Sequence, residues 1–72
     1  MKKFAVIDQT AHDWFETIFD TEAEAINEAD YLWGAMTDYD KKRRESFFVA
    51  SCDLDEDGCI DWDTIKEIKV YK

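Results

Sequence analysis

The sequence contains no proline, only two glycines and a single histidine among its 72 residues. Gly34 and Gly58 are too far apart to form a glycine-rich phosphate-binding loop. His12 is the one histidine, it lies in a polar stretch typical of a turn, and it has no serine or carboxylate arranged around it as a catalytic set. A chain this short also leaves little room for the deep cleft that shifts the pKa of a catalytic carboxylate. We therefore expect a protein that is not an enzyme.

Cysteine is scarce as well. Cys52 and Cys59 are the only two, and with one remote histidine they do not match the ligand spacing of a zinc site. No hydrophobic run approaches the roughly 20 residues of a membrane-spanning helix, and the short apolar run after Lys3 is not typical of an export signal. We expect a cytoplasmic protein of bacterial type whose cysteines are reduced thiols.

Positive charge is sparse and unevenly distributed. Nine lysines and arginines face 18 aspartates and glutamates, for a net charge of −9. No lysine or arginine occurs between Phe4 and Asp40, and the cations gather at the two ends and in the cluster at 41–44. Such a field repels nucleic acid over most of the surface and attracts a basic partner. The alternative explanation is that the acidity serves solubility alone.

Aromatic residues are abundant: three tryptophans, five phenylalanines and three tyrosines give the chain material for one modest core. The stretch from Thr21 to Met36 is the one long predicted helix, because its apolar residues recur three and four positions apart and form a stripe suited to covering a sheet. The stripe comprises Ala25, Ile26, Ala29, Leu32, Trp33 and Met36. Thr21 and Glu24 have the spacing of an N-terminal capping box. Thr37 begins either a short second helix or, if the helix merely bends, a continuation to Glu45.

Extended segments are predicted on both sides of the helix. They cover residues 2–8, 14–19, 46–54 and 59–64, whereas 65–72 fits either a strand or a helix. The turn at Asp55–Gly58 predicts a hairpin in which Gly58 is left-handed, Asp53 opposes Asp61, and Cys52 opposes Trp62. That register gives one apolar and one acidic face, and it keeps the two cysteines apart. We predict a single α+β domain over 1–72, in the order β-β-α-β-β, with one main helix on a mainly antiparallel four-stranded sheet. A β-grasp-like connection is possible.

The segment from Asp53 to Thr64 resembles an EF-hand calcium loop. Its carboxylates fall at loop positions 1, 3, 5 and 9, with glycine at position 6. These metal-ligand candidates are Asp53, Asp55, Asp57 and Asp61. Thr64 stands where the loop normally has a bidentate glutamate, and the flanking segments lack the periodicity of helices. The resemblance implies calcium as an alternative ligand, and a plain acidic hairpin is the competing interpretation.

Three further stretches resemble short proteins of bacterial genomes and mobile elements, a group to which no function is assigned. They are the opening Lys2–Asp8, the segment from Trp33 through Thr37 to Lys42, and the segment from Phe48 to Asp61. The resemblance covers most of the chain. It implies an accessory or regulatory role more than a metabolic one.

The sequence predicts a small regulatory module that binds a protein through an acidic surface, without cofactors. The candidate residues for this surface are Asp53, Asp55, Asp57, Asp61 and Asp63 in the hairpin, with Glu22, Glu24 and Glu28 in the helix. A basic partner is favoured by charge, and no direct binding of nucleic acid or membrane is expected. A sharper version is a protein that mimics the charge of nucleic acid. The alternatives are the calcium module and a self-associating structural domain that pairs through residues 2–8.

Overall fold

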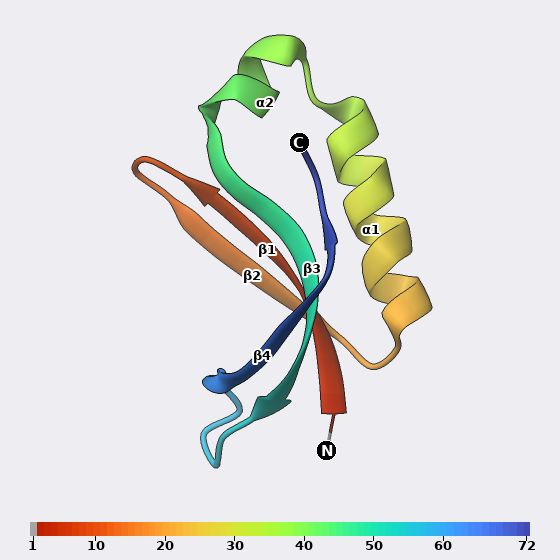
Figure 1. Cartoon of the computed structure of the whole chain (residues 1–72), viewed down its shortest axis with the longest axis vertical. Helices are drawn as coiled ribbons and strands as arrows, with labels where there is room; N and C mark the ends of the chain where they lie inside the picture. Colours follow the sequence, from red (N-terminus) through yellow and green to blue (C-terminus); the bar gives the residue numbers. More distant parts are fainter. Residues whose placement is uncertain (1) are drawn as a thin grey trace.

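The computed structural model describes residues 2–72 and shows two helices and four strands (Figure 1). They are β1 (Lys2–Thr10), β2 (Trp14–Phe19), α1 (Glu22–Ala35), α2 (Asp38–Arg43), β3 (Arg44–Leu54) and β4 (Ile60–Val70). The predicted α+β class and element order are confirmed, and the ambiguous tail is strand as far as Val70. Neither helix in this part of the chain has the length and hydrophobicity that crossing a membrane requires.

The four strands form one sheet in the order β2-β1-β3-β4, and all three pairs are antiparallel. β1 is therefore an inner strand with partners on both sides. The expectation that residues 2–8 pair across a dimer is wrong, because the backbone groups of that strand are already used within the sheet. The order also differs from a β-grasp, since β1 pairs antiparallel with β3 and has no parallel neighbour.

Both helices begin at the predicted threonines. Thr21 caps α1 by accepting the Glu24 backbone N–H at 3.2 Å, while its hydroxyl donates to the Glu24 carboxylate at 2.9 Å. Thr37 and Asp40 make the full reciprocal capping box of α2. The chain between the helices is extended at Met36 and Thr37, so the alternative of one bent helix reaching Glu45 is wrong.

The main core lies between α1 and one face of the sheet, with Val6, Ala25, Ala29, Phe47 and Val49 fully or almost fully buried. The predicted helical stripe packs onto this core, which confirms that it covers a sheet. The C-terminal end closes the same core. The Tyr71 backbone N–H donates to the Phe47 carbonyl at 2.9 Å, and its ring lies 5.3 Å from the Phe47 ring and 5.7 Å from the Trp33 ring.

A polar clasp joins the end of the chain to α1. Asp30 accepts hydrogen bonds from the Tyr71 hydroxyl and, at 2.9 Å, from the Lys69 ammonium. The Tyr71 bond and then the Lys69 bond lower the pKa of Asp30 below its ordinary 3.8. Burial, followed by the bond to Asp30, raises the pKa of Tyr71 above its ordinary 10.0. Asp30 remains exposed while it makes both contacts.

The clasp predicts a stability that falls at both ends of the pH scale. A lowered carboxyl pKa stabilises the fold above pH 3.8 and ceases to do so as pH falls through the folded value of Asp30. A raised tyrosine pKa stabilises the fold below pH 10.0 and ceases to do so as pH rises through the folded value of Tyr71. We expect Tyr71→Phe to melt at a lower temperature than the native protein near neutral pH, with the gap narrowing at both extremes. A constant gap across the titration would contradict this assignment.

Candidate functional site

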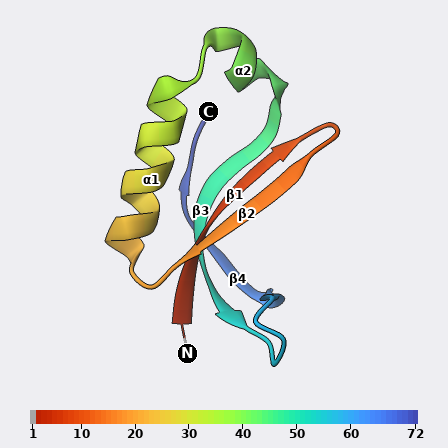
Figure 2. The ribbon, with the colours of Figure 1, turned by 180° about the vertical axis from the view of Figure 1, so that it is seen from behind.

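The face of the sheet opposite α1 carries a second apolar cluster that no helix of the described chain covers. Ala5, Ile7, Cys52 and Ile60 are at most 4% exposed, and Phe48, Leu54 and Ile65 pack against them. α1 lies on the other side of the sheet in both ribbon views (Figures 1 and 2). We call this side the open face. Strand register places Trp14, Glu16, Ile18, Glu67 and Val70 on it, and Trp62 joins them through its contact with Trp14.

Two tryptophans from opposite edges of the sheet meet on the open face. Trp14 lies on β2 and Trp62 on β4, which are the two outermost strands. In a flat sheet these strands would be about 14 Å apart, but the two rings lie 5.3 Å apart in an edge-to-face arrangement. The two long side chains therefore reach toward each other across a sheet that is strongly twisted, since β4 crosses β1 and β2 at a steep angle (Figure 1). Trp14 and Trp62 remain 49% and 44% exposed, so about half of each side chain is available to a partner.

The open face carries negative charge along β2, one of its edges. Glu16 lies between Trp14 and Ile18 on β2, and its carboxylate accepts the Trp14 indole N–H at 3.4 Å. Burial raises the pKa of the Cys52 thiol, and the charges of Asp53 and Glu16 raise it further. The one cation that register assigns to this face in residues 2–72 is Lys3, whose ammonium is paired with Asp20. The face is thus apolar and negative.

The acidic hairpin between β3 and β4, residues 53–63, adjoins the open face at one end. Leu54 and Ile60 belong to the open face, whereas Asp53 and Asp61 oppose each other on the other side of the hairpin. Gly58 has a φ of 82°, the left-handed conformation expected for it. The Asp55 carboxylate accepts the backbone N–H of Asp57 at 2.9 Å and that of Cys59 at 3.0 Å. Asp61 accepts the N–H of Asp63 at 3.1 Å. Two of the candidate carboxylates therefore also hold the shape of the hairpin.

Two substitutions of Asp55 separate the effect of its charge from the effect of its hydrogen bonds in the turn. Asp55→Ala removes the two hydrogen bonds that the Asp55 side chain makes in the turn, and we expect the free energy of unfolding to fall by about 1–2 kcal/mol. Asp55→Asn keeps an acceptor oxygen and removes only the charge, so it should stay within about 0.5 kcal/mol of the native protein. Urea denaturation of both variants measures the difference. Equal destabilisation by the two substitutions would show that charge, and not the turn geometry, is what the position supplies.

The register of the hairpin matches the prediction near its tip and departs from it further along. Asp53 opposes Asp61 and Leu54 opposes Ile60, as expected. The register then shifts between Ser51 and Asp53, so the predicted pairing of Cys52 with Trp62 is wrong. At the shift, the Thr64 side chain takes the place of a regular backbone pair: its hydroxyl donates to the Asp61 carbonyl at 2.7 Å and accepts the Asp53 N–H at 2.9 Å. The same stretch of β4 holds Trp62, whose ring contacts that of Trp14 edge to face.

The two cysteines lie apart. Cys52 is buried and Cys59 exposed, and both thiols are free.

The helical candidates form a separate group. Glu22 and Glu24 lie in the first turn of α1, where the helix dipole favours carboxylates, and Glu24 is also bonded to Thr21. Figures 1 and 2 place this end of α1 and the acidic hairpin on opposite sides of the start of β1. The eight predicted acidic residues are thus divided between two surfaces, and only the hairpin group adjoins the exposed tryptophans.

The calcium interpretation remains a prediction. Among residues 2–72, no three or more histidine, cysteine, aspartate or glutamate side chains are gathered so as to hold a metal ion. If the loop does bind calcium, a titration should give a saturable rise in melting temperature and a change in the fluorescence of Trp62. Magnesium at matched ionic strength controls for general screening, and Asp55→Asn with Asp57→Asn should remove the response. An equal response to both ions would contradict a calcium site.

The sequence predicts an apolar face of the hairpin and the alternation of β2, but not how the two combine. The alternation in 14–19 predicts that Trp14, Glu16 and Ile18 share a face, which the structure confirms. The contact between Trp14 and Trp62 joins the two outermost strands of the sheet, beside a register shift in β4, and no local motif indicates either feature. In comparisons with known proteins, no family model, no curated protein and no solved structure matches this chain.

Proposed function

We propose that the protein is a non-enzymatic binding module that holds a basic segment of a partner protein against its open face and acidic hairpin. The observation that carries the proposal is the exposed pair Trp14 and Trp62, which sits among carboxylates on a face without a covering helix. Half-exposed tryptophans seated on a rigid sheet have the properties of interface anchors, since tryptophan is enriched among the residues that dominate binding energy.

The charges around the anchors favour a basic partner. Register places Glu16 and Glu67 on the open face with the tryptophans, and Asp61 and Asp63 are the neighbours of Trp62 in the sequence. The faces of the two indole rings can also take a lysine or arginine side chain by cation–π contact. Complementary charge of this kind mainly speeds the encounter and selects the partner, while the apolar contacts slow its release. Glu22, Glu24 and Glu28 would add to the long-range field without touching the bound segment.

A nucleic-acid-binding protein is the sharper candidate for the partner. Such proteins carry the basic surface that a net charge of −9 on 72 residues would attract. Binding there would place carboxylates where phosphates normally lie, and the protein would then act as a mimic of nucleic-acid charge. This version predicts that the bound partner no longer retains its nucleic acid.

The test is capture of partners on the immobilised protein from a bacterial lysate, washed at low salt and at about 0.5 M salt, where exposed charges are strongly screened. We expect basic proteins to be retained at low salt and released at high salt. Retention that does not respond to salt, or that selects acidic proteins, would overturn the proposal. A recovered basic protein that still holds its nucleic acid when bound would overturn only the mimic version.

Paired charge variants locate the surface on the recovered protein. Asp61→Asn with Asp63→Asn removes two charges beside Trp62, whereas Glu22→Gln with Glu24→Gln removes two charges from α1. The net charge changes equally, so any long-range effect is matched. We expect the hairpin pair to weaken binding several-fold more than the helix pair. The reverse order would assign binding to the helix.

A further inference from the structure

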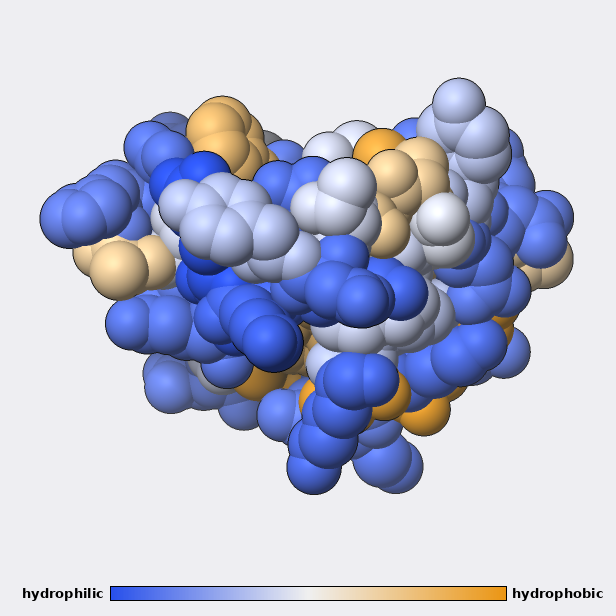
Figure 3. All heavy atoms as spheres, turned by 90° about the horizontal axis from the view of Figure 1, so that it is seen from above, coloured by the Kyte–Doolittle hydropathy of each residue, from blue (hydrophilic) through white to orange (hydrophobic). Residues whose placement is uncertain are grey.

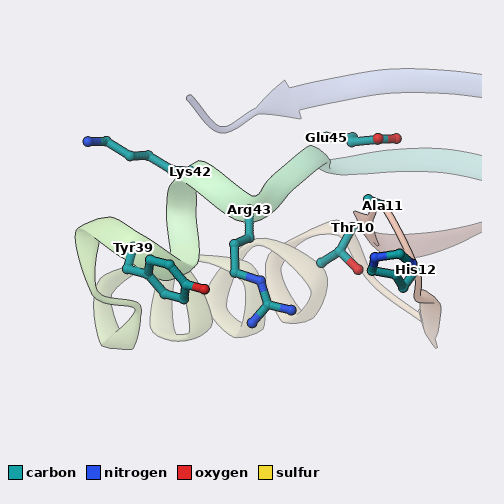
Figure 4. Close-up of a pocket in the computed structure, with 7 residues that line it drawn as sticks. All are labelled: Thr10, Ala11, His12, Tyr39, Lys42, Arg43 and Glu45. Atoms are coloured by element: carbon teal, nitrogen blue, oxygen red, sulfur yellow. The ribbon is translucent and has the colours of Figure 1, made fainter.

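A pocket of about 550 Å³ lies between α2 and the turn that joins β1 to β2. It is lined by Thr10, Ala11 and His12 from the strand end and turn, by Tyr39, Lys42 and Arg43 from α2, and by Glu45 from β3 (Figure 4). The residues come from segments about 30 positions apart in the sequence. The surrounding end of the molecule is mainly hydrophilic, with small and separate hydrophobic groups (Figure 3).

Arg43 is the central group of this pocket. Its guanidinium lies over the Tyr39 ring, 5.6 Å from the ring centre, and Figure 4 shows it directed with the Tyr39 hydroxyl toward the space beside Thr10 and His12. Lys3, Arg44 and Lys69 each form an ion pair with an aspartate. Arg43 and Lys42 form none in the part of the chain that the structure describes, and neither do the other four lysines there, so Arg43 is distinguished by its position in the pocket.

Stabilisation of α2 does not account for this arrangement. Three cations occupy the last turn of α2, where the helix dipole favours them, and the effect needs only their charge. It does not require Arg43 to be held by a tyrosine ring opposite a histidine from another loop. Lys41 illustrates the difference, because its ammonium lies over the Trp33 ring, 5.1 Å from its centre, away from the pocket.

The lining of the pocket suits an anion. Arginine offers up to five N–H donors in a planar fork, tyrosine a hydroxyl, and histidine at least one ring N–H. The Thr10 hydroxyl is occupied with the Asp13 backbone. Glu45 is the one carboxylate of the lining. It accepts a long bond of 3.4 Å from the Gln9 side chain, and it points away from Arg43 in Figure 4. Lys42 also points away there and adds charge without contact.

We propose that this pocket binds a phosphate group, with Arg43 as its principal ligand and with Tyr39 and His12 as further donors. The planar fork of arginine matches two oxygens of a phosphate and gives strong, charge-assisted hydrogen bonds. The exposed Tyr39 ring, 69% accessible, offers a surface for a ring attached to the phosphate. The site is separate from the open face, so it stands independently of the partner proposed above.

The test is a titration of the isotopically labelled protein followed by NMR, with inorganic phosphate and phenyl phosphate as the two probes. Sodium chloride at matched ionic strength controls for screening. We expect saturable shifts confined to residues 10–13 and 39–45. Arg43→Gln should weaken phosphate binding about tenfold or more, since one charge-assisted pair is lost. Lys66→Gln is the matched control, because it removes one cation from β4 outside the pocket, and it should leave binding unchanged.

The titrations show which kind of phosphate the pocket binds and whether Arg43 is its ligand. Tighter binding of phenyl phosphate than of inorganic phosphate supports a phosphate carried on an aromatic or heterocyclic ring, and equal binding supports a free or aliphatic phosphate. Shifts that follow ionic strength alone, or that persist in Arg43→Gln, would overturn the site. Arg43→Lys keeps the charge but not the fork, so binding that is fully retained in this variant would overturn the role given to arginine geometry.

Discussion

Replacing Phe47 with alanine is expected to lower the free energy of unfolding by about 3–5 kcal/mol. Phe47 is 1% exposed and is among the largest fully buried side chains. Its ring contacts Trp33 from α1 and Tyr71 from the chain end, at centre distances of 5.4 and 5.3 Å. A cavity at this position would loosen three elements together. A domain of 72 residues has a total stability of about 4–11 kcal/mol, so the loss is a large part of it.

Urea denaturation followed by circular dichroism measures this effect. Phe15→Ala is the matched control, because the same side chain is removed from a position that is 62% exposed. The control should unfold within about 0.5 kcal/mol of the native protein. Similar midpoints for the two variants would show that the core between α1 and the sheet does not carry the stability of the fold.

Replacing Trp14 or Trp62 with alanine is expected to weaken binding of the captured basic partner about 30-fold, which corresponds to about 2 kcal/mol for an interface anchor. The double variant should abolish measurable binding. The reason is geometric, because each ring supports the other across the open face at 5.3 Å, so removal of one also frees its neighbour. Calorimetry or surface-based binding with the purified partner measures the loss.

Phe15→Ala is also the control for the binding experiment, for a different reason. Phe15 is the neighbour of Trp14 on β2 and is also exposed, but strand alternation directs it to the opposite face. Phe15→Ala should therefore bind normally. Circular dichroism of each variant separates lost binding from lost structure. Normal binding by a folded double tryptophan variant would remove the observation on which the proposed function rests.

The sequence predicted the elements of this fold well where the determinants are local. Thr21 and Thr37 begin helices because their hydroxyls satisfy free backbone N–H groups. Gly58 sets the hairpin because the turn needs a positive φ. The apolar stripe of α1 has the helical period and packs as expected. Strand order could not be derived in the same way, because β1 pairs with β3 across about 40 intervening residues.

The candidate site was predicted only in part, for the same physical reason. Aspartates close together in the sequence identify the acidic hairpin, but the open face combines β2 with β4 from opposite edges of the sheet. The helical carboxylates were grouped with the hairpin on charge alone, although the fold separates them. The pocket at Arg43 was missed because a run of four cations from Lys41 to Arg44 reads as one cluster. In the structure, Arg44 pairs with Asp8 while Arg43 faces the turn that contains His12.

The irregular pairing of β4 has a consequence for behaviour at high concentration. An outermost strand with a regular ladder offers a template on which further chains can add and grow into fibrils. β4 interrupts its ladder twice, between Val49 and Ala50 and between Ser51 and Asp53 on its partner strand, and such bulges twist an edge away from flat pairing. The other edge, β2, offers only six residues. We therefore expect the same departure from regularity that accompanies the Trp62 contact to disfavour the addition of further chains at this edge.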